Sequence, residues 1–310
     1  MNIYHTSEIA ILMAVFNGEK FLEEQLDSLL AQTHSAWTAY IHDDGSTDGT
    51  LSILENYAAR YPDRFVRIDG VPTGSSRDNF FYLFQCVDAP LYMCCDQDDV
   101  WLPDKIEQTL RRMQEIDAAP EKPCMVYTDL TVADESLHVI AESMDRYQKL
   151  NMADAGISHV LVQNVATGCT MMANRSLRDR MLQLREPDSV IMHDWWAALV
   201  AAQFGVMCYL DRPTILYRQH SGNDTGAQQA GLRLYLDKLF HQKKEIHDSV
   251  EAFRKQAAVF AETFSLPEDS VVAVYARINT FSKCKRLKIY RKYKIKKSPL
   301  QRQLGIWLFG

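Results

Sequence analysis

The chain has 310 residues, 47% of them hydrophobic, and a formal net charge of −6 at pH 7, which is typical of a soluble globular protein with one large core or a catalytic domain plus a smaller region. It contains no run of about 18 apolar residues, and its N-terminus has an acidic Glu8 and no basic start, which excludes a membrane span and a secretory signal. Seven cysteines without a CxxC pair or zinc-type histidine spacing predict reduced thiols in a cytoplasmic protein.

The first 100 residues alternate apolar runs with amphipathic segments. Strand-like runs occupy 9–16, 37–44, 65–69 and 91–96, and helical patterns occupy 19–33, 46–61 and 77–87. In the first of these patterns, Leu22, Leu26 and Leu29 lie on one stripe of a helix. Short strands that alternate with helices predict βαβ units, so we expect an α/β fold with a mostly parallel sheet.

Beyond Asp129 the pattern is looser. The segments 164–177, 191–205 and 213–224 predict a strand, a helix and one or two strands that close the domain. From Gln228 onward the composition is helical. We therefore expect a catalytic domain over residues 1–226 and a helical C-terminal region over 227–310.

Acidic residues follow two strands of the predicted sheet. Asp43 and Asp44 follow one strand, and Asp96, Asp98 and Asp99 follow another. Ligands of an open α/β sheet bind at these carboxyl ends. Clustered carboxylates raise each other's pKa unless a cation compensates them, and Mg²⁺ or Mn²⁺ shared with substrate phosphates would do so. The alternative is a helix cap, although a cap needs only one carboxylate.

Several other phosphate and metal sites are excluded by their signatures. The chain has no GxxxxGK[ST] motif, no GxGxxG motif after its first strand, and Trp101 where a calcium loop beginning at Asp96 needs glycine. The stretch DQDDV resembles the DxDx[TV] signature of haloacid-dehalogenase phosphatases, but that motif normally opens its domain. An aspartate-nucleophile phosphatase and a non-catalytic nucleotide-sugar binding module remain as alternatives.

Four motifs in order carry a family resemblance: AVFNGEKFLEEQLDSLLAQT, DDGSTDGT, DQDDVWLPDK and HDWW. Together they resemble the family 2 inverting glycosyltransferases, over about residues 8–225. The stretches YTDL, TGCTMM and LYRQH make the chain similar to bacterial rhamnosyltransferases of cell-wall and O-antigen polysaccharide synthesis. The resemblance implies a GT-A fold, which is a Rossmann-like mixed sheet flanked by helices, with a helical C-terminal extension.

The resemblance also implies which residues bind the nucleotide-sugar donor. The nucleotide would contact the first strand end and one carboxylate after the second strand, from the set Ala14, Phe16, Asn17, Glu19, Asp43 and Asp44. Such a carboxylate accepts the imide N–H of uracil or thymine, which favours a dTDP- or UDP-sugar. Asp96 would face the ribose or the metal, and Asp98 would be the principal ligand of Mg²⁺ or Mn²⁺. Asn79 would line the donor sugar, and Arg218 and His220 would contact the diphosphate or the metal.

On the acceptor side, Asp194 of HDWW matches the general base of the family. A base in contact with an acceptor hydroxyl contributes on the order of 10² to 10⁴ in rate. The alternative for Asp194 is a helix N-cap, which is compatible with the catalytic role. Thr167 and Gly168 would line the acceptor, and Trp195 and Trp196 would offer it a flat apolar face unless they belong to the core. The preceding residue is a histidine where many relatives carry glutamate, and its role stays open.

The charge is concentrated at the C-terminus. Residues 277–310 contain 11 Lys or Arg and no Asp or Glu, whereas residues 1–276 have a net charge of −17. Basic residues mixed with Trp307 and Phe309 favour an anionic membrane surface, where a lipid-linked saccharide acceptor would be found. A solvated helix face and a nucleic-acid patch are the alternatives; the apolar end GIWLFG argues against nucleic acid as a partner. A homodimer through these helices is a further hypothesis.

These observations predict a metal-dependent inverting glycosyltransferase on the cytoplasmic face of the plasma membrane. Its expected donor is dTDP-rhamnose, with a UDP-hexose as the alternative, and its expected acceptor is a hydroxyl of a lipid-linked saccharide.

Overall fold

The computed structural model describes all residues except 1–2, 7, 117–118, 120, 221–242 and 310. The strands are β1 (Tyr4–His5), β2 (Ile9–Val15), β3 (Trp37–Asp43), β4 (Phe65–Arg67), β5 (Val87–Asp88), β6 (Leu91–Cys95), β7 (Val100–Trp101), β8 (Cys124–Ala133), β9 (Val139–Ala141), β10 (Met171–Asn174) and β11 (Val206–Arg218). The helices are α1 (Leu22–Leu30), α2 (Thr50–Arg60), α3 (Ser76–Cys86), α4 (Lys105–Ile116), α5 (Met144–Gln148), α6 (Ile157–Val160), α7 (Arg175–Met181), α8 (His193–Phe204), α10 (Lys243–Thr263), α11 (Val271–Ala276), α12 (Lys283–Lys292) and α13 (Leu300–Phe309). Every strand and helix predicted for the first 100 residues is present.

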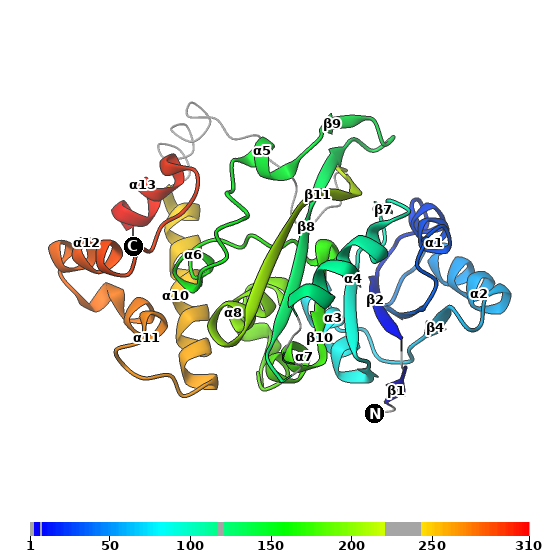
Figure 1. Cartoon of the computed structure of the whole chain (residues 1–310), viewed down its shortest axis with the longest axis horizontal. Helices are drawn as coiled ribbons and strands as arrows, with labels where there is room; N and C mark the ends of the chain where they lie inside the picture. The colour runs from blue at the N-terminus through cyan, green and yellow to red at the C-terminus, as the bar shows by residue number, and fades with distance from the viewer. Residues whose placement is uncertain (1–2, 7, 117–118, 120, 221–242, 310) are drawn as a thin grey trace.

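A twisted sheet crosses the molecule, with helices on both sides (Figure 1). Among the described residues it has nine strands, in the order β4-β3-β2-β6-β10-β8-β11-β7, with β9 paired to β8. The pairs β4–β3, β3–β2, β2–β6 and β8–β11 are parallel, whereas β10 runs antiparallel to both of its neighbours. The carboxyl ends of β2, β3 and β6 therefore meet at one edge, as the sequence predicts.

The two faces of the sheet have separate cores because successive side chains of a strand point to opposite sides. In β2, Ala10 and Leu12 face the cluster that contains α3 and α8. Ile9, Ile11 and Met13 face the cluster that contains α1, α2 and α4. Since both faces are covered, β2 is apolar throughout, as expected of a central parallel strand.

The C-terminal helices share the first of these cores. Trp195 packs on Phe253 and Trp196 on Phe260 of α10, each at 5.1 Å between ring centroids. The helical C-terminal region is thus present, and it is packed against the sheet domain rather than tethered to it. The predicted boundary at 226/227 lies outside the described residues. Within the described parts of the chain, none of the helices has the length and apolar character of a membrane span.

Candidate active site

A cavity of about 460 Å³ lies at the carboxyl ends of β2, β3 and β6 and beside the start of α8. Residues from distant parts of the sequence line it. The predicted residues on its wall are Ala14, Phe16, Asp44, Asn79, Asp96, Asp98, Thr167, Gly168 and Asp194. The cavity therefore brings together the ends of three strands and the proposed catalytic base.

Three predicted nucleotide contacts lie outside this cavity and organise its loops. The Asp43 carboxylate accepts two backbone N–H groups of its own turn, at 3.1 and 3.0 Å. Asn17 Oδ1 and Glu19 Oε2 each accept a backbone N–H of the 47–49 segment, both at 2.9 Å. These side chains hold the two strand-end loops together, whereas Asp44 and Phe16 face the cavity.

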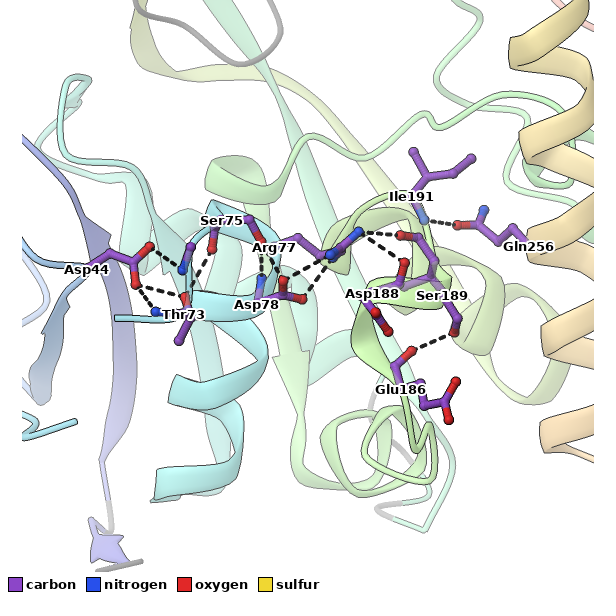
Figure 2. Close-up of polar contacts among 12 residues, drawn as sticks. Asp44, Thr73, Ser75, Arg77, Asp78, Glu186, Asp188, Ser189, Ile191 and Gln256 are labelled. Carbon is purple, nitrogen blue, oxygen red and sulfur yellow. Dashed lines mark hydrogen bonds and ion pairs between the residues drawn. The ribbon is translucent and has the colours of Figure 1, made fainter. Parts of the chain in front are cut away.

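Asp44 joins the β3 end of the cavity to the loop before α3. Its carboxylate accepts the Thr73 hydroxyl at 2.9 Å and the Gly74 N–H at 2.9 Å, as well as the Thr73 N–H (Figure 2). The next residue, Ser75, caps α3 by accepting the Asp78 N–H at 3.1 Å, and its hydroxyl donates to the Asp78 carboxylate at 2.7 Å. The loop that holds Asp44 is thus rigidly continuous with the first turn of α3.

Arg77 extends this network toward the catalytic side (Figure 2). Its guanidinium donates two hydrogen bonds to Asp78, both at 2.9 Å, and one to the carbonyl of Val190 at 3.0 Å. The following N–H, of Ile191, donates to Gln256 Oε1 of α10 at 2.9 Å. Hydrogen bonds with Arg77 and Gln256 therefore fix the segment that leads into α8 and Asp194. The sequence analysis missed this role of Arg77 because no local pattern marks it.

The acidic cluster after β6 is divided by the fold. Asp96 and Asp98 line the cavity, whereas Asp99 is buried and accepts the Arg218 N–H at 3.2 Å. Burial, together with the charges of Asp96 and Asp98, raises the pKa of Asp99 well above its ordinary value. Asp98 Oδ2 lies 2.7 Å from His220 Nε2, so two of the residues predicted to contact a metal are in direct contact with each other.

A second set of potential ligand atoms, from Asp96, Asp99 and Cys169, lies within 4.8 Å of one another. Burial raises the pKa of both Asp99 and Cys169 well above their ordinary values. Metal ions bind the carboxylate and the thiolate rather than the protonated groups. The pair Asp98 and His220 is therefore the better candidate, and Asp96 lines the same cavity as Asp98.

Gln97, between the two cavity-lining aspartates, was also missed. Its amide accepts the Phe16 N–H at 2.8 Å and donates to the Phe16 carbonyl at 2.8 Å. Sequence could have suggested it only through its position in DQDD. It ties the β6 end to the β2 end.

Arg218 corrects one prediction. Its side chain is only 3% exposed, and it donates to the carbonyls of Asp98 at 2.8 Å and Glu135 at 2.6 Å and forms an ion pair with Glu24. The guanidinium also stacks over Phe21, 4.4 Å from the ring centroid. These bonds hold Arg218 against the loop that carries Asp98, so in this structure the guanidinium braces that loop and does not line the cavity.

Asp194 lies in the first turn of α8, and Met192 occupies the N-cap position. The alternative of an Asp194 N-cap is therefore incorrect. Its Oδ2 accepts the Gly168 N–H at 2.9 Å. Burial outweighs these hydrogen bonds and raises the pKa of Asp194 to about 6. A carboxylate with a pKa near neutrality, on a cavity wall, is suited to accept a proton.

Both tryptophans after Asp194 belong to the core, which corrects their predicted role at the acceptor. Trp196 is fully buried and Trp195 nearly so. Their indole N–H groups donate to the carbonyls of Met181 at 3.2 Å and Val160 at 2.6 Å. A sugar cannot stack on rings that are covered on both faces by protein.

His193, whose role the sequence left open, is nearly buried and lines the cavity next to Asp194. Its ring stacks on Phe80 at 4.1 Å between centroids, and burial lowers its pKa to about 3, so it is uncharged at neutral pH. A Cβ at position 168 would lie 2.8 Å from His193 Nε2. Gly168 is therefore needed for the close approach of the loop to this ring.

Known proteins resemble the chain in sequence. Residues 10–179 match the family model described as glycosyl transferase family 2. The chain is 30% identical over 232 residues to the dTDP-rhamnosyl transferase RfbG of Shigella flexneri, covering 69% of this chain and 74% of that protein. It is also 30% identical over 101 residues to the putative glycosyltransferase EpsE of Bacillus subtilis (strain 168), covering 33% of this chain and 36% of that protein.

Solved structures share the fold at low sequence identity. TarS of S. aureus, residues 1–349 in complex with UDP-GlcNAc, aligns with a TM-score of 0.54 at 13% identity, over 93% of this chain and 88% of that one. A mannosyltransferase of Pyrobaculum calidifontis in complex with GDP-Man and Mn²⁺ aligns with a TM-score of 0.52 at 15% identity, over 97% of this chain and 86% of that one. Because the family match spans more than half of its length, the chain belongs to glycosyl transferase family 2 and is a glycosyltransferase of GT-A fold.

Proposed function

We propose that the chain is a metal-dependent inverting glycosyltransferase that transfers L-rhamnose from dTDP-rhamnose to a hydroxyl of a lipid-linked saccharide, in bacterial surface polysaccharide synthesis. The observation that carries this proposal is the buried Asp194 carboxylate, with a pKa raised to about 6, on the wall of the cavity that also contains Asp44, Asp96 and Asp98. One cavity thus holds the groups for donor binding and for proton removal. Because the chain belongs to glycosyl transferase family 2, we no longer favour the two alternatives, an aspartate-nucleophile phosphatase and a non-catalytic binding module.

The nucleotide would bind at the β2 and β3 ends. The Phe16 ring is 54% exposed at the cavity and offers a surface on which a base can stack. Of the adjacent residues Asp43 and Asp44, Asp44 is the one that lines the cavity. Its carboxylate is therefore the candidate acceptor for the imide N–H of thymine or uracil. Because its oxygens already accept loop N–H groups, its orientation is set before the nucleotide arrives.

A divalent cation would be held by Asp98 and His220, in the cavity that Asp96 also lines. The fit rests on the two facing donor atoms, Asp98 Oδ2 and His220 Nε2, on side chains that are only 14% and 16% exposed. Carboxylate oxygen and imidazole nitrogen suit Mn²⁺, and carboxylates with substrate phosphates suit Mg²⁺. When bound, the ion supplies positive charge that stabilises the diphosphate leaving group.

Asp194 would remove the proton from the acceptor hydroxyl as that oxygen attacks the anomeric carbon of the donor sugar. Direct displacement from the face opposite the leaving diphosphate inverts the configuration. The Gly168 N–H holds the carboxylate in place, and burial keeps its basicity high. Thr167 and Gly168, on the same wall, are the candidate acceptor contacts.

The sugar is the finer part of the proposal. The identity to the dTDP-rhamnosyl transferase of Shigella flexneri over 69% of this chain supports dTDP-rhamnose. A UDP-hexose is the second candidate because thymine and uracil offer the same imide N–H. The lipid-linked acceptor is supported by the basic C-terminal segment, whose 11 cations are accompanied by no acidic residue.

A binding screen tests the donor first. Thermal shift or calorimetry would compare dTDP-rhamnose, dTDP-glucose, UDP-glucose, UDP-galactose and GDP-mannose, each with Mn²⁺ and with EDTA. We expect dTDP-rhamnose to bind most tightly, and only with metal. Metal-dependent binding of a UDP-sugar instead would replace the donor, and binding of no nucleotide sugar would refute the proposed reaction.

A further inference from the structure

The end of the molecule formed by α12 and α13 carries a dense positive charge. Six cationic side chains are exposed over residues 283–294: Lys283, Lys285, Lys288, Arg291, Lys292 and Lys294. A seventh exposed lysine, Lys296, forms an ion pair with Asp154. Among the described residues, none of the six forms an ion pair. Because residues 277–310 contain no Asp or Glu, the segment cannot neutralise itself.

The same end also exposes large apolar side chains. Leu287 of α12 is 50% exposed, and Trp307 and Leu308 of α13 are 46% and 62% exposed. These residues are not loosely held, because Ile289 and Ile306 on the inner sides of the two helices are buried. The fold therefore fixes which side chains point outward.

We propose that this end of the molecule, α12 and α13, is a docking surface for an anionic lipid membrane. Lysine and arginine side chains attract acidic headgroups, and Trp and Leu insert at the boundary between headgroups and acyl chains. A nucleic acid would be attracted by the same cations but offers no apolar layer to Leu308. The combination of unpaired cations with exposed Trp307 and Leu308 is what favours lipid.

The charge distribution would also orient the protein. The remaining residues, 1–276, have a net charge of −17, and α12 and α13 lie at the opposite end of the molecule from α2 (Figure 1). An anionic surface repels the acidic body and attracts the basic end. The enzyme would thus meet the membrane with α12 and α13. This inference deepens the proposed lipid-linked acceptor and rests on the proposed function, because it would hold the enzyme at the membrane where such an acceptor resides.

Vesicle binding tests the surface without any reaction. The full-length chain would be sedimented with phosphatidylcholine vesicles that contain or lack phosphatidylglycerol, at low and high salt. We expect binding that requires the anionic lipid and weakens with salt. The double variant Lys288→Gln/Arg291→Gln should bind about 10- to 30-fold more weakly. The double variant Trp307→Ser/Leu308→Ser should also bind more weakly, and its remaining binding should depend more strongly on salt than that of the parent.

A matched control removes two exposed lysines outside α12 and α13, Lys122→Gln/Lys149→Gln. It should bind within about twofold of the parent chain, since only local charge acts strongly across a Debye length. Unfolding temperatures of all three variants should equal that of the parent because every altered side chain is exposed.

Three outcomes would overturn the inference: no binding of the parent chain to anionic vesicles, equal losses in the patch and control variants, or preferential binding of an oligonucleotide that does not depend on Trp307 and Leu308. Transfer of sugar to a soluble acceptor, measured in parallel, keeps the two proposals apart. A chain that binds vesicles but transfers nothing would refute the reaction alone. A chain that transfers but never binds vesicles would refute the docking surface alone.

Discussion

At the scale of single residues, burial gives adjacent titratable side chains of the site different properties. Asp98 faces the cavity while Asp99, one residue later, is buried beneath it. Asp194 is kept at a cavity wall with a raised pKa, and its neighbour His193 is held uncharged. Burial thus prepares one group to take a proton and prevents the adjacent imidazole from competing for it.

Replacing Asp194 by Asn should reduce turnover about 10²- to 10⁴-fold, because the acceptor hydroxyl loses its base. Binding of the donor with metal should be nearly unchanged, since Asp194 is not among the metal candidates. In the parent enzyme, kcat/KM should fall on the acid side with a midpoint near pH 6, where Asp194 becomes protonated. A parallel loss of donor binding, or a pH profile that is flat through 6, would remove Asp194 from this role.

The same substitution should change stability in a pH-dependent way. The folded chain holds the Asp194 proton with a pKa of about 6, above the ordinary 3.8, so the protonated form favours folding and this contribution is lost as pH rises through 6. Asn has no proton to lose. The unfolding free energy of Asp194→Asn minus that of the parent should therefore increase by up to about 3 kcal/mol from pH 4 to pH 7.5. Urea unfolding at both pH values measures this difference, which a pH-independent result would contradict.

At the scale of elements, the loop before α8 is fixed by two different helices. Arg77 of α3 binds the Val190 carbonyl, and Gln256 of α10 binds the Ile191 N–H. These bonds lie three to four residues before Asp194, the proposed base. A small movement of this loop would therefore move Asp194 relative to a donor bound, as proposed, at the ends of β2, β3 and β6.

Arg77→Gln should lower kcat about 10- to 100-fold, because small misplacements of a catalytic group are costly. The dissociation constant of the donor should not change, since the bonds of Asp44 to the 73–74 loop do not involve Arg77. Arg67→Gln is the control: it removes a partly exposed arginine that pairs with Glu55 at 3.1 Å outside the cavity, and it should have little effect. Equal changes in kcat and donor affinity for Arg77→Gln would indicate general damage rather than positioning.

At the scale of the whole molecule, the C-terminal helices belong to the same cooperative core as the sheet. Phe260 of α10 is fully buried and contacts Trp196 and Phe264, at 5.1 and 4.8 Å between centroids. Trp196, two residues after the proposed base Asp194, is thus packed by a helix of the C-terminal region. We therefore expect α10 and the candidate site to unfold together, in a single transition.

Phe260→Ala should cost about 3–5 kcal/mol of unfolding free energy, and the chain should still unfold in one transition. Val139→Ala, at a side chain that is 51% exposed, is the control and should stay within about 0.5 kcal/mol of the parent. Calorimetry with far- and near-ultraviolet dichroism would measure both. Two separate transitions, with only one shifted by Phe260→Ala, would show that the regions fold independently.

The sequence by itself determined the alternation of strands and helices, the acidic strand ends and the family. These follow from local periodicity and from motifs whose residues are adjacent in the chain. The carboxyl ends of β2, β3 and β6 had to meet once the sheet was parallel. The position of Asp194 followed from its motif, and its place on the cavity wall agrees with it.

Only the tertiary structure decided which member of each polar pair faces the cavity. Past the end of a strand, turn geometry rather than alternation sets the direction of a side chain, so Asp43 closes its own turn while Asp44 lines the cavity. Arg218 is buried because acceptors from three distant segments surround its guanidinium, and Trp195 and Trp196 are buried because α10 covers them. Partners so far apart in the chain leave no local pattern, since their contacts arise only when the core is packed.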